Sequence, residues 1–259
     1  MSAVDNPTIH RVMHEIKRRR LQVLRVVDLT PRMRRITLGG PELAGFVSLG
    51  TDDHVKLLFP QNAAETAALE HLVLGAGKTD QPMPAMRDYT PRRYDLKTLE
   101  LDIDFVLHGD GPAATWAEQA KPGQFLHIGG PRGSMIVPDI FDSYLLIGDE
   151  TALPAIARRL EELPAGRKVL AVIEIADAAE QQALQSAAEV DVIWVLRGQA
   201  DLLDTVRTLT LPSGALYTFV AMETKLSRQV RRVLLDTHQV NEEFLKAVGY
   251  WRAQGSEEE

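Results

Sequence analysis

The chain has 259 residues, 45% of them hydrophobic and 25% charged, which is typical of a globular protein with a core of its own. Asp and Glu number 36 against 29 Lys and Arg, so the formal charge of −7 gives no reason to expect nucleic-acid binding. Cysteine is absent, which excludes disulfide scaffolds, thiol nucleophiles and cysteine-ligated metal centres. With no signal-like or membrane-length apolar run, we expect a cytoplasmic protein without stable membrane insertion.

The first half of the sequence has the pattern of a β-structure. Short apolar or alternating runs bounded by turn residues predict strands at 21–27, 33–38, 54–59, 99–108 and 124–128. In the run 99–108 the alternation is nearly strict, so one face is expected to be buried and the acidic residues to point outward. Strands without a long helix between them predict an antiparallel Greek-key β-barrel. Residues 61–86 form a polar connection that is either functional or mobile.

In the second half, strand-like and helix-like runs alternate. The pattern predicts strands at 144–147, 169–175, 192–196 and 217–220, and helices at 153–163, 178–188, 202–209 and 227–235. This alternation indicates βαβ units, hence a doubly wound parallel sheet with helices on both faces. The predicted fold is therefore a two-domain β plus α/β protein, with domains at 1–140 and 141–259.

One motif, Arg87-Asp88-Tyr89-Thr90-Pro91-Arg92, matches the Arg-x-Tyr-Ser/Thr signature of flavoproteins related to ferredoxin–NADP reductase. The chemistry suits that role, because a guanidinium grips a phosphate with two hydrogen bonds and a tyrosine ring packs on a flavin. The hydroxyl of Thr90 would reach the polar edge of the flavin. A surface turn with an incidental ion pair is the other interpretation of so short a pattern.

A second motif runs from Asp104 to Ala117 as a strand, a Gly/Pro turn and the start of a helix. The backbone N–H groups of Ala113, Ala114 and Thr115 are expected to face outward and to hold a pyrophosphate. His108 would either hydrogen-bond a cofactor or cap the end of the strand.

A third motif, Gly148-Asp149-Glu150-Thr151, lies at the first strand-to-helix turn of the predicted parallel sheet. Nucleotides bind just beyond the carboxyl ends of such strands. Because the turn has a single glycine, it lacks the usual dinucleotide fingerprint, and an N-capped helix explains it equally well.

Together these motifs resemble the siderophore-interacting protein family, and the similarity runs in order from Leu21 to Arg252. It is carried by five stretches of this sequence: Asp53–Leu57, Arg87–Arg92, Gly130–Ser134, Gly148–Ala155 and Gly249–Arg252. Two positions depart from the family pattern. Ala114 stands where the family usually has Ser, and Met222 stands where it has the Gly of an Ala-Gly-Glu triplet.

The resemblance implies a bound FAD that accepts hydride from NADPH or NADH and passes single electrons to chelated ferric iron, releasing it as Fe(II). The implied partner is a ferric siderophore or another ferric chelate, with no nucleic acid, and we expect a monomer. A small redox protein is an alternative electron donor. Neither a resident metal site nor a catalytic side chain beyond the flavin is expected.

The expected site residues form three groups. For FAD they are Arg87, Tyr89, Thr90, Asp104, Val106, His108, Ala113, Ala114 and Thr115. For the nicotinamide nucleotide they are Gly148, Asp149, Glu150, Thr151, Arg197 and Glu223, with NADPH favoured because an Arg at a strand end pairs with a 2′-phosphate. For an anionic ferric chelate they are Lys56, Arg132, Lys246 and Trp251.

Two other functions are compatible with the same sequence. One is a binding module that captures or hands on a ferric siderophore, and the other is a general flavin reductase with a quinone or a redox protein as acceptor. The basic run Lys17–Arg20 has no interleaved aromatic residues and is expected to be a solvated arm.

Overall fold

The computed structural model describes residues 8–72, 82–109 and 111–253. The chain forms two compact units, residues 1–137 and 138–259. Each unit has a large sheet and a hydrophobic core of its own. Within the described residues, every helix is too short or too polar to cross a bilayer.

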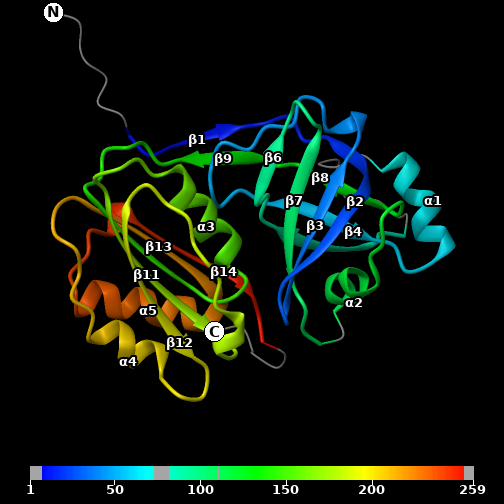
Figure 1. The fold of residues 1–259 in the computed structure, drawn as a ribbon. Helices are drawn as coiled ribbons and strands as arrows, with labels where there is room; N and C mark the ends of the chain where they lie inside the picture. Colours follow the sequence, from blue (N-terminus) through cyan, green and yellow to red (C-terminus); the bar gives the residue numbers. More distant parts are fainter. Residues whose placement is uncertain (1–7, 73–81, 110, 254–259) are drawn as a thin grey trace, which may run out of the picture. The chain divides into compact units, whose positions relative to one another are not determined.

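A seven-stranded antiparallel sheet dominates the first unit (Figure 1). Its spatial order is β5-β4-β8-β2-β3-β7-β6. The strands are β2 (Arg18–Thr30), β3 (Met33–Gly39), β4 (Val55–Phe59), β5 (Ala85–Tyr89), β6 (Arg93–Asp95), β7 (Glu100–Val106) and β8 (Phe125–Gly129). A separate pair joins β1 (His10–Met13) to β9 (Gly133–Ile136). The predicted antiparallel barrel is confirmed as a curled half-barrel. Its edge strands β5 and β6 do not pair with each other, so the sheet is not closed.

The core of this unit follows from the alternation along its strands. Leu101, Ile103 and Phe105 of β7 are fully buried and pack in one apolar cluster. Helix α2 (Pro112–Gln119) adds Ala113 and Ala117 to the same cluster. Small side chains on this face let the helix lie close to the sheet.

Helix α1 (Ala63–His71) was not predicted and lies inside the connection 61–86. Its N-cap is Asn62, whose side chain accepts a hydrogen bond from the backbone N–H of Glu65 at 2.9 Å. The Glu65 carboxylate in turn accepts from the N–H of Gln61 at 2.8 Å. This reciprocal pattern is a helix-start signal that was present in the sequence.

The second unit holds a five-stranded parallel sheet of order β12-β11-β10-β13-β14. Its strands are β10 (Ser143–Gly148), β11 (Lys168–Ile175), β12 (Glu189–Leu196), β13 (Leu216–Glu223) and β14 (Leu245–Trp251). Its helices are α3 (Leu153–Glu162), α4 (Leu202–Arg207) and α5 (Thr224–Asp236). Because the chain runs outward from β10 in one direction and then returns to β13 on its other side, the topological switch lies between these two strands.

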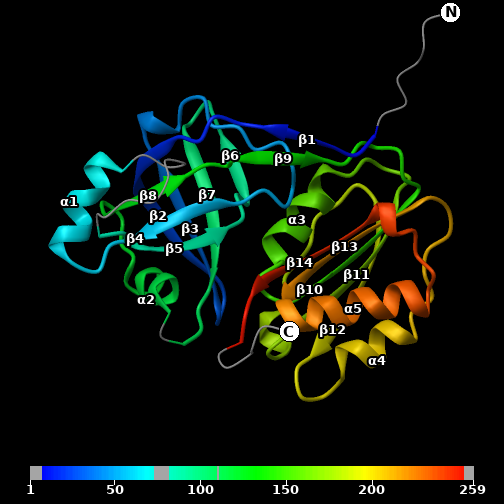
Figure 2. The same ribbon diagram turned by 180° about the vertical axis from the view of Figure 1, so that it is seen from behind.

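Helices cover both faces of this sheet, as predicted. Leu145 and Ile147 of β10 belong to the apolar cluster that α4 and α5 complete, and these two helices lie together on one face (Figure 2). The alternate residue Gly148 faces the opposite way, where a Cβ atom would meet the side chains of Ala152 and Ile156 near the start of α3. The strand period of two therefore assigns α3 to the second face.

The predicted helix 178–188 is wrong. Only a single 3-10 turn forms at Ala178–Glu180, capped by the Asp177 side chain, and the rest of the segment has neither helix nor strand structure. Exposure alternates from residue to residue, and the Ser186 hydroxyl donates to the Leu160 carbonyl at 2.6 Å. Contact with the end of α3 thus overrides the helix propensity of the alanines.

Candidate flavin and nucleotide sites

Most residues predicted for the nucleotide lie on one edge of the parallel sheet. Gly148 ends β10, Glu223 ends β13 and Trp251 ends β14, while Arg197 directly follows β12. Since all five strands are parallel, their carboxyl ends share this edge. The strands that end at Gly148 and Glu223 flank the topological switch, where open α/β sheets bind their ligands.

The turn after β10 is braced by Asp149, which is only 2% exposed. Its Oδ1 accepts hydrogen bonds from the backbone N–H and the hydroxyl of Thr151. Its Oδ2 accepts from the indole Nε1 of Trp251 at 2.7 Å. Burial raises the pKa of Asp149, and these hydrogen bonds oppose the rise. Both oxygens are engaged by the protein, so Asp149 shapes the turn.

Arg197 forms an ion-pair cluster with Glu150 and Glu174. Its Nη1 and Nη2 donate to the two oxygens of Glu150 at 3.2 and 2.8 Å. Its Nε and Nη2 also donate to a single oxygen of Glu174 at 3.2 and 3.0 Å. Burial lowers the pKa of Arg197, but the two carboxylates outweigh burial and raise it overall.

Glu174 was not among the predicted site residues. It is the penultimate residue of β11, the second strand of the unit, and so joins the carboxyl edge. The signal for it was an acidic residue at the end of the second strand of a nucleotide-type sheet, where such residues bind a ribose hydroxyl.

Glu223 caps helix α5 with one carboxylate oxygen, Oε2, which accepts from the N–H of Leu226 at 2.9 Å. The other oxygen, Oε1, is buried and has no hydrogen-bond partner among the described residues. The preceding residue, Met222, is fully buried in the cluster under α4 and α5. The Met222 side chain, which stands where the family has glycine, therefore packs inside the core.

The first-unit motif lies on an edge strand. Arg87 and Tyr89 of β5 pair with Leu57 and Val55 of β4 and, being two residues apart, share one face. The Tyr89 ring packs on Phe105 with 4.6 Å between centroids, and burial raises the pKa of its hydroxyl. Arg87 remains exposed and donates to the Met86 carbonyl at 2.8 Å. Next in the chain, Thr90 is buried, at 7% exposure.

The start of α2 differs in one respect from the prediction. The N–H of Thr115 donates to the Gly111 carbonyl at 2.9 Å, so the expectation that it faces outward is wrong. Helix geometry closes this bond once the first turn is complete. Pro112 lacks an N–H, which leaves the amides of Ala113 and Ala114 as the first-turn donors. His108 is exposed beyond the end of β7.

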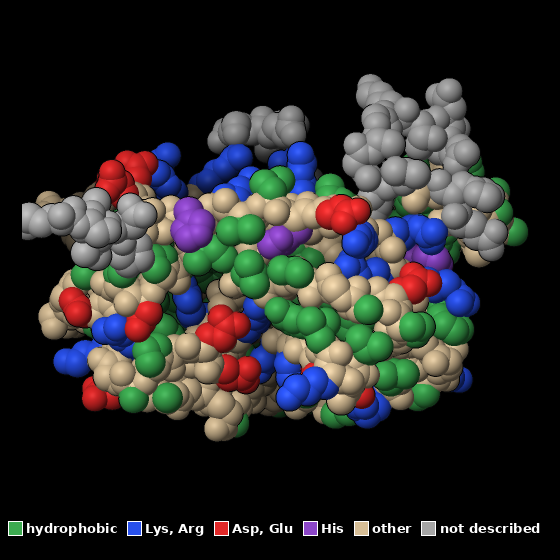
Figure 3. All heavy atoms as spheres, turned by 90° about the horizontal axis from the view of Figure 1, so that it is seen from above, with side chains coloured by type: hydrophobic (Ala, Val, Ile, Leu, Met, Phe, Trp, Pro, Cys, Tyr) green, Lys and Arg blue, Asp and Glu red, His purple; other side chains and the backbone are tan. Residues whose placement is uncertain are grey.

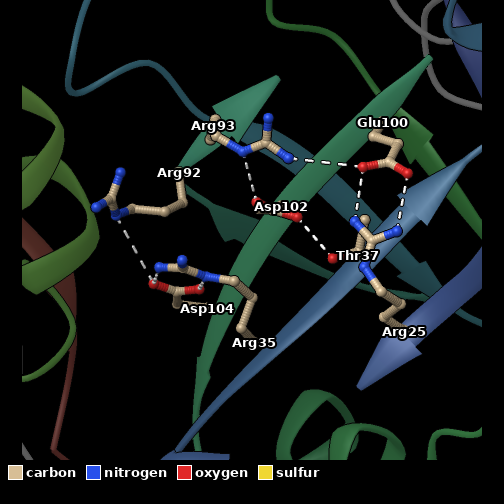
Figure 4. A network of polar contacts seen from close by, with 8 residues as sticks. All are labelled: Arg25, Arg35, Thr37, Arg92, Arg93, Glu100, Asp102 and Asp104. Atoms are coloured by element: carbon tan, nitrogen blue, oxygen red, sulfur yellow. Dashed lines mark hydrogen bonds and ion pairs between the residues drawn. The ribbon is translucent and has the colours of Figure 1, made fainter. Parts of the chain in front are cut away.

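The outward-pointing acids of β7 are not solvated, contrary to expectation. Asp104 is 6% exposed and accepts two hydrogen bonds from Arg35 of β3, at 2.7 and 2.8 Å (Figure 4). Arg92 approaches the same carboxylate to 4.0 Å. The Asp104 carboxylate, predicted for FAD, is thus paired within the protein, and Val106 ends the same strand, half-buried.

The same network continues along β7. Asp102 accepts from the Thr37 hydroxyl at 2.7 Å and from Arg93 at 2.9 Å, and Glu100 pairs with Arg25 at 2.8 and 2.6 Å (Figure 4). Register explains the burial, because Thr37 lies directly opposite Asp102. Alternation predicted that the acidic side chains of β7 are exposed to solvent. Arginines on neighbouring strands pair with them instead.

The candidate substrate residues come from both units, two from each. Lys56 is exposed and its Nζ lies 2.8 Å from an oxygen of Asp88, while Arg132 is exposed in the loop between β8 and β9. Lys246 is the second residue of β14 and Trp251 its last, so the two lie about 16 Å apart along the strand. Trp251, 42% exposed, is therefore at the carboxyl edge and Lys246 is near the other end.

The surface carries charges of both signs. Lys and Arg side chains are interspersed with Asp and Glu over the face in Figure 3.

Within residues 8–72, 82–109 and 111–253, no group of three or more His, Asp or Glu side chains is arranged to hold a metal ion.

A curled antiparallel sheet followed by a parallel sheet of nucleotide-binding order recurs in two-domain flavin reductases, but a fold by itself does not define an activity. Comparison with known families makes the assignment specific. Residues 22–135 match the siderophore-interacting FAD-binding domain, and residues 141–254 match the siderophore-interacting protein domain. The chain belongs to the siderophore-interacting protein family.

Individual relatives agree with this assignment. The chain is 35% identical to an NADPH-dependent ferric-chelate reductase of Escherichia coli, over 94% of this chain and 96% of that one. It is 30% identical to the ferric vibriobactin reductase ViuB of Vibrio cholerae, over 93% and 91%. Among solved structures, a siderophore utilization protein from T. fusca has a TM-score of 0.84 and 38% identity, covering 96% of this chain and 98% of that one.

Proposed function

We propose that this protein is a ferric-siderophore reductase that holds FAD and takes electrons from a nicotinamide nucleotide, with NADPH preferred. Its family and its ferric-chelate and ferric-vibriobactin reductase relatives support the activity. The observation that carries the proposal is that Gly148, Glu223 and Trp251 end three neighbouring parallel strands at one edge of the sheet. The same chain also carries an Arg-x-Tyr-Thr motif at the end of edge strand β5. We assign FAD to residues 1–140 and the nucleotide to 141–259, in the cytoplasm, where NADPH is supplied.

The residues of the first unit fit a flavin. Tyr89 offers a ring that Phe105 holds in place, and Arg87 offers an exposed guanidinium on the same strand face for a phosphate. The amides of Ala113 and Ala114 at the start of α2 offer a second phosphate contact. When bound, FAD supplies the exchange between the two-electron chemistry of a nicotinamide and the one-electron reduction of ferric iron.

The second unit offers matching groups for a nicotinamide nucleotide. Gly148 has no side chain, which lets the start of α3 pack close to the strand end, and the turn from Glu150 to Thr151 leads into helix α3. The buried Oε1 of Glu223 lacks a donor among the described residues and fits a carboxamide N–H₂. Arg197 supplies the positive charge that a 2′-phosphate requires.

For the ferric chelate we propose two separate sets of contact groups: Lys56 and Arg132, exposed cations of the first unit, and, in the second unit, the exposed ring of Trp251. Anionic oxygen-rich chelates are attracted to such cations, and an aromatic ring offers a flat contact surface. We keep Lys246 as a weaker candidate, since it lies at the far end of β14 from Trp251.

An anaerobic titration tests the activity. The purified protein with added FAD should show a flavin spectrum that NADPH bleaches and that a ferric siderophore restores, with Fe(II) trapped by a ferrous-specific dye. If no flavin binds, the proposal is wrong. If flavin binds but neither nucleotide bleaches it, a redox protein is the donor, and if the ferric siderophore does not restore the colour, the acceptor is another molecule.

Two substitutions test the residues. Arg87→Gln should weaken FAD binding about tenfold or more, because one phosphate contact with a charged group is lost. Lys56→Glu should lower the rate with an anionic ferric chelate while leaving the reduction by NADPH unchanged. Lys97→Glu is the matched control, since Lys97 is also exposed and lies in the turn before β7. Equal effects of the two lysine reversals would contradict a local substrate site.

A further inference from the structure

We infer that Glu174 sets the nucleotide preference of this protein by competing with the 2′-phosphate of NADPH for Arg197. The inference rests on the proposed function, in which a nicotinamide nucleotide binds the carboxyl edge of the parallel sheet. It concerns Glu174 of β11, which was not among the residues predicted for the nucleotide site.

The first observation is that Arg197 is already occupied. A guanidinium has five N–H donors, and Arg197 makes four hydrogen bonds to the carboxylates of Glu150 and Glu174. A phosphate is normally gripped by two parallel N–H groups. For Arg197 to grip a 2′-phosphate in this way, one of the two carboxylates has to release it.

The second observation identifies which carboxylate is the weaker partner. Glu150 binds Arg197 with both oxygens, whereas Glu174 uses one oxygen for two nitrogens at 3.2 and 3.0 Å. Burial also raises the pKa of Glu174, although the charge of Arg197 opposes the rise, so its charged form is costly to keep. We therefore expect Arg197 to keep its hydrogen bonds to Glu150 and to exchange those to Glu174 for the 2′-phosphate.

The third observation is the position of Glu174. It lies at the carboxyl end of the second strand of a sheet whose first strand-to-helix turn is at Gly148. A carboxylate at this position accepts hydrogen bonds from an unmodified ribose and repels a phosphorylated one. Glu174 thus favours NADH in two ways, because it occupies Arg197 and because it adds a negative charge near the 2′-position.

The net charge of the cluster formed by Arg197, Glu150 and Glu174 supports the same conclusion. One guanidinium faces two carboxylates, so the cluster carries an excess negative charge when both are ionised. Arg197 makes NADPH acceptable, and Glu174 limits the preference for it. Removing the Glu174 charge should strengthen NADPH binding without improving NADH binding.

The test uses nucleotide fragments that differ only in the 2′-phosphate, and it needs no turnover. Calorimetric titration with 2′,5′-ADP and with 5′-AMP gives the ratio of their affinities for each variant. Glu174→Gln should raise the 2′,5′-ADP to 5′-AMP affinity ratio about tenfold, as expected for removing one charge several ångströms from a phosphate. Glu174→Ser should raise it similarly, and Arg197→Gln should lower the ratio below one, because Glu150 and Glu174 then face the 2′-phosphate without a cation.

The matched control is Glu189→Gln, the same substitution at the exposed amino end of the neighbouring strand β12, which should leave the ratio unchanged. An unchanged ratio in both Glu174 variants, each shown to be folded by circular dichroism, overturns the inference and leaves the proposed function standing. Failure of the unaltered protein to bind either fragment overturns the nucleotide site itself, and the inference with it.

Discussion

The indole nitrogen of Trp251 donates a 2.7 Å hydrogen bond to the buried carboxylate of Asp149. This bond connects the end of β14 to the turn after β10, across the end of the intervening strand β13. Asp149 is nearly inaccessible while Trp251 is 42% exposed. A buried acid therefore fixes an exposed aromatic ring at the carboxyl edge of the sheet.

Removing the acid should release the ring. The chain has three tryptophans, so Trp116→Phe and Trp194→Phe leave Trp251 as the only tryptophan, which can be excited selectively over the tyrosines. In that background, Asp149→Ala should red-shift the emission and increase quenching by acrylamide, because the indole loses its only fixed polar partner among the hydrogen bonds described here. Thr151→Val removes a different bond to Asp149 and should leave both signals unchanged. Unaltered quenching in the Asp149 variant would show that β14 alone orients the ring.

Asp149 should also make stability depend on pH. Burial raises its pKa in the folded protein, so between about pH 4 and the raised value the folded state binds more protons than the unfolded state. The free energy of unfolding therefore falls as pH rises through this window, and the loss is complete above the folded-state pKa. Asp149→Asn removes this contribution.

Urea unfolding of both proteins from about pH 4 to pH 8 measures this effect. The stability of the unaltered protein relative to Asp149→Asn should decrease with rising pH. A constant difference would mean that hydrogen bonds from Thr151 and Trp251 balance the burial of Asp149, and a difference that grows with pH would mean that they outweigh it.

Gly249 allows β14 and α5 to approach each other. A Cβ atom at this position would overlap Oγ1 of Thr224 and lie 2.9 Å from its Cα. Gly249→Ala should cost about 1–3 kcal/mol of unfolding free energy, as other overpacked sites do. Adding Thr224→Ala should recover part of this loss, because it removes the hydroxyl but leaves the backbone contact. Full recovery in urea unfolding would locate the whole clash in the hydroxyl.

The ion pairs of the β7 acids should contribute unequally to the free energy of unfolding. Asp104 is almost fully buried against Arg35, so Asp104→Asn removes a buried negative charge that balances a partly buried guanidinium and should cost about 3 kcal/mol. Arg25 is 51% exposed where it pairs with Glu100, so Arg25→Gln should cost less than about 1 kcal/mol. Urea unfolding of the two variants compares them directly. Equal losses would indicate that the network acts as one unit.

Local patterns predicted most of the strands correctly, because alternation and apolar runs report directly on which side of a chain is buried. They failed where a distant segment decided the outcome. The alanines of 178–188 stay non-helical because Ser186 bonds to the end of α3. The acids of β7 are buried because β3 and β6 bring arginines against them. Such partners have no signature within the segment itself.

Short segments that can be recognised locally were enough to predict the two-domain organisation, the Arg-x-Tyr-Thr motif and most of the residues found at the carboxyl edge of the parallel sheet. Which of those groups remain available depends on contacts between strands that no single segment reveals. Arg197 is shared by Glu150 and Glu174, and the Asp104 carboxylate is paired with Arg35. The physical reason is that hydrogen bonds and ion pairs between strands depend on register and strand order, which long-range folding sets.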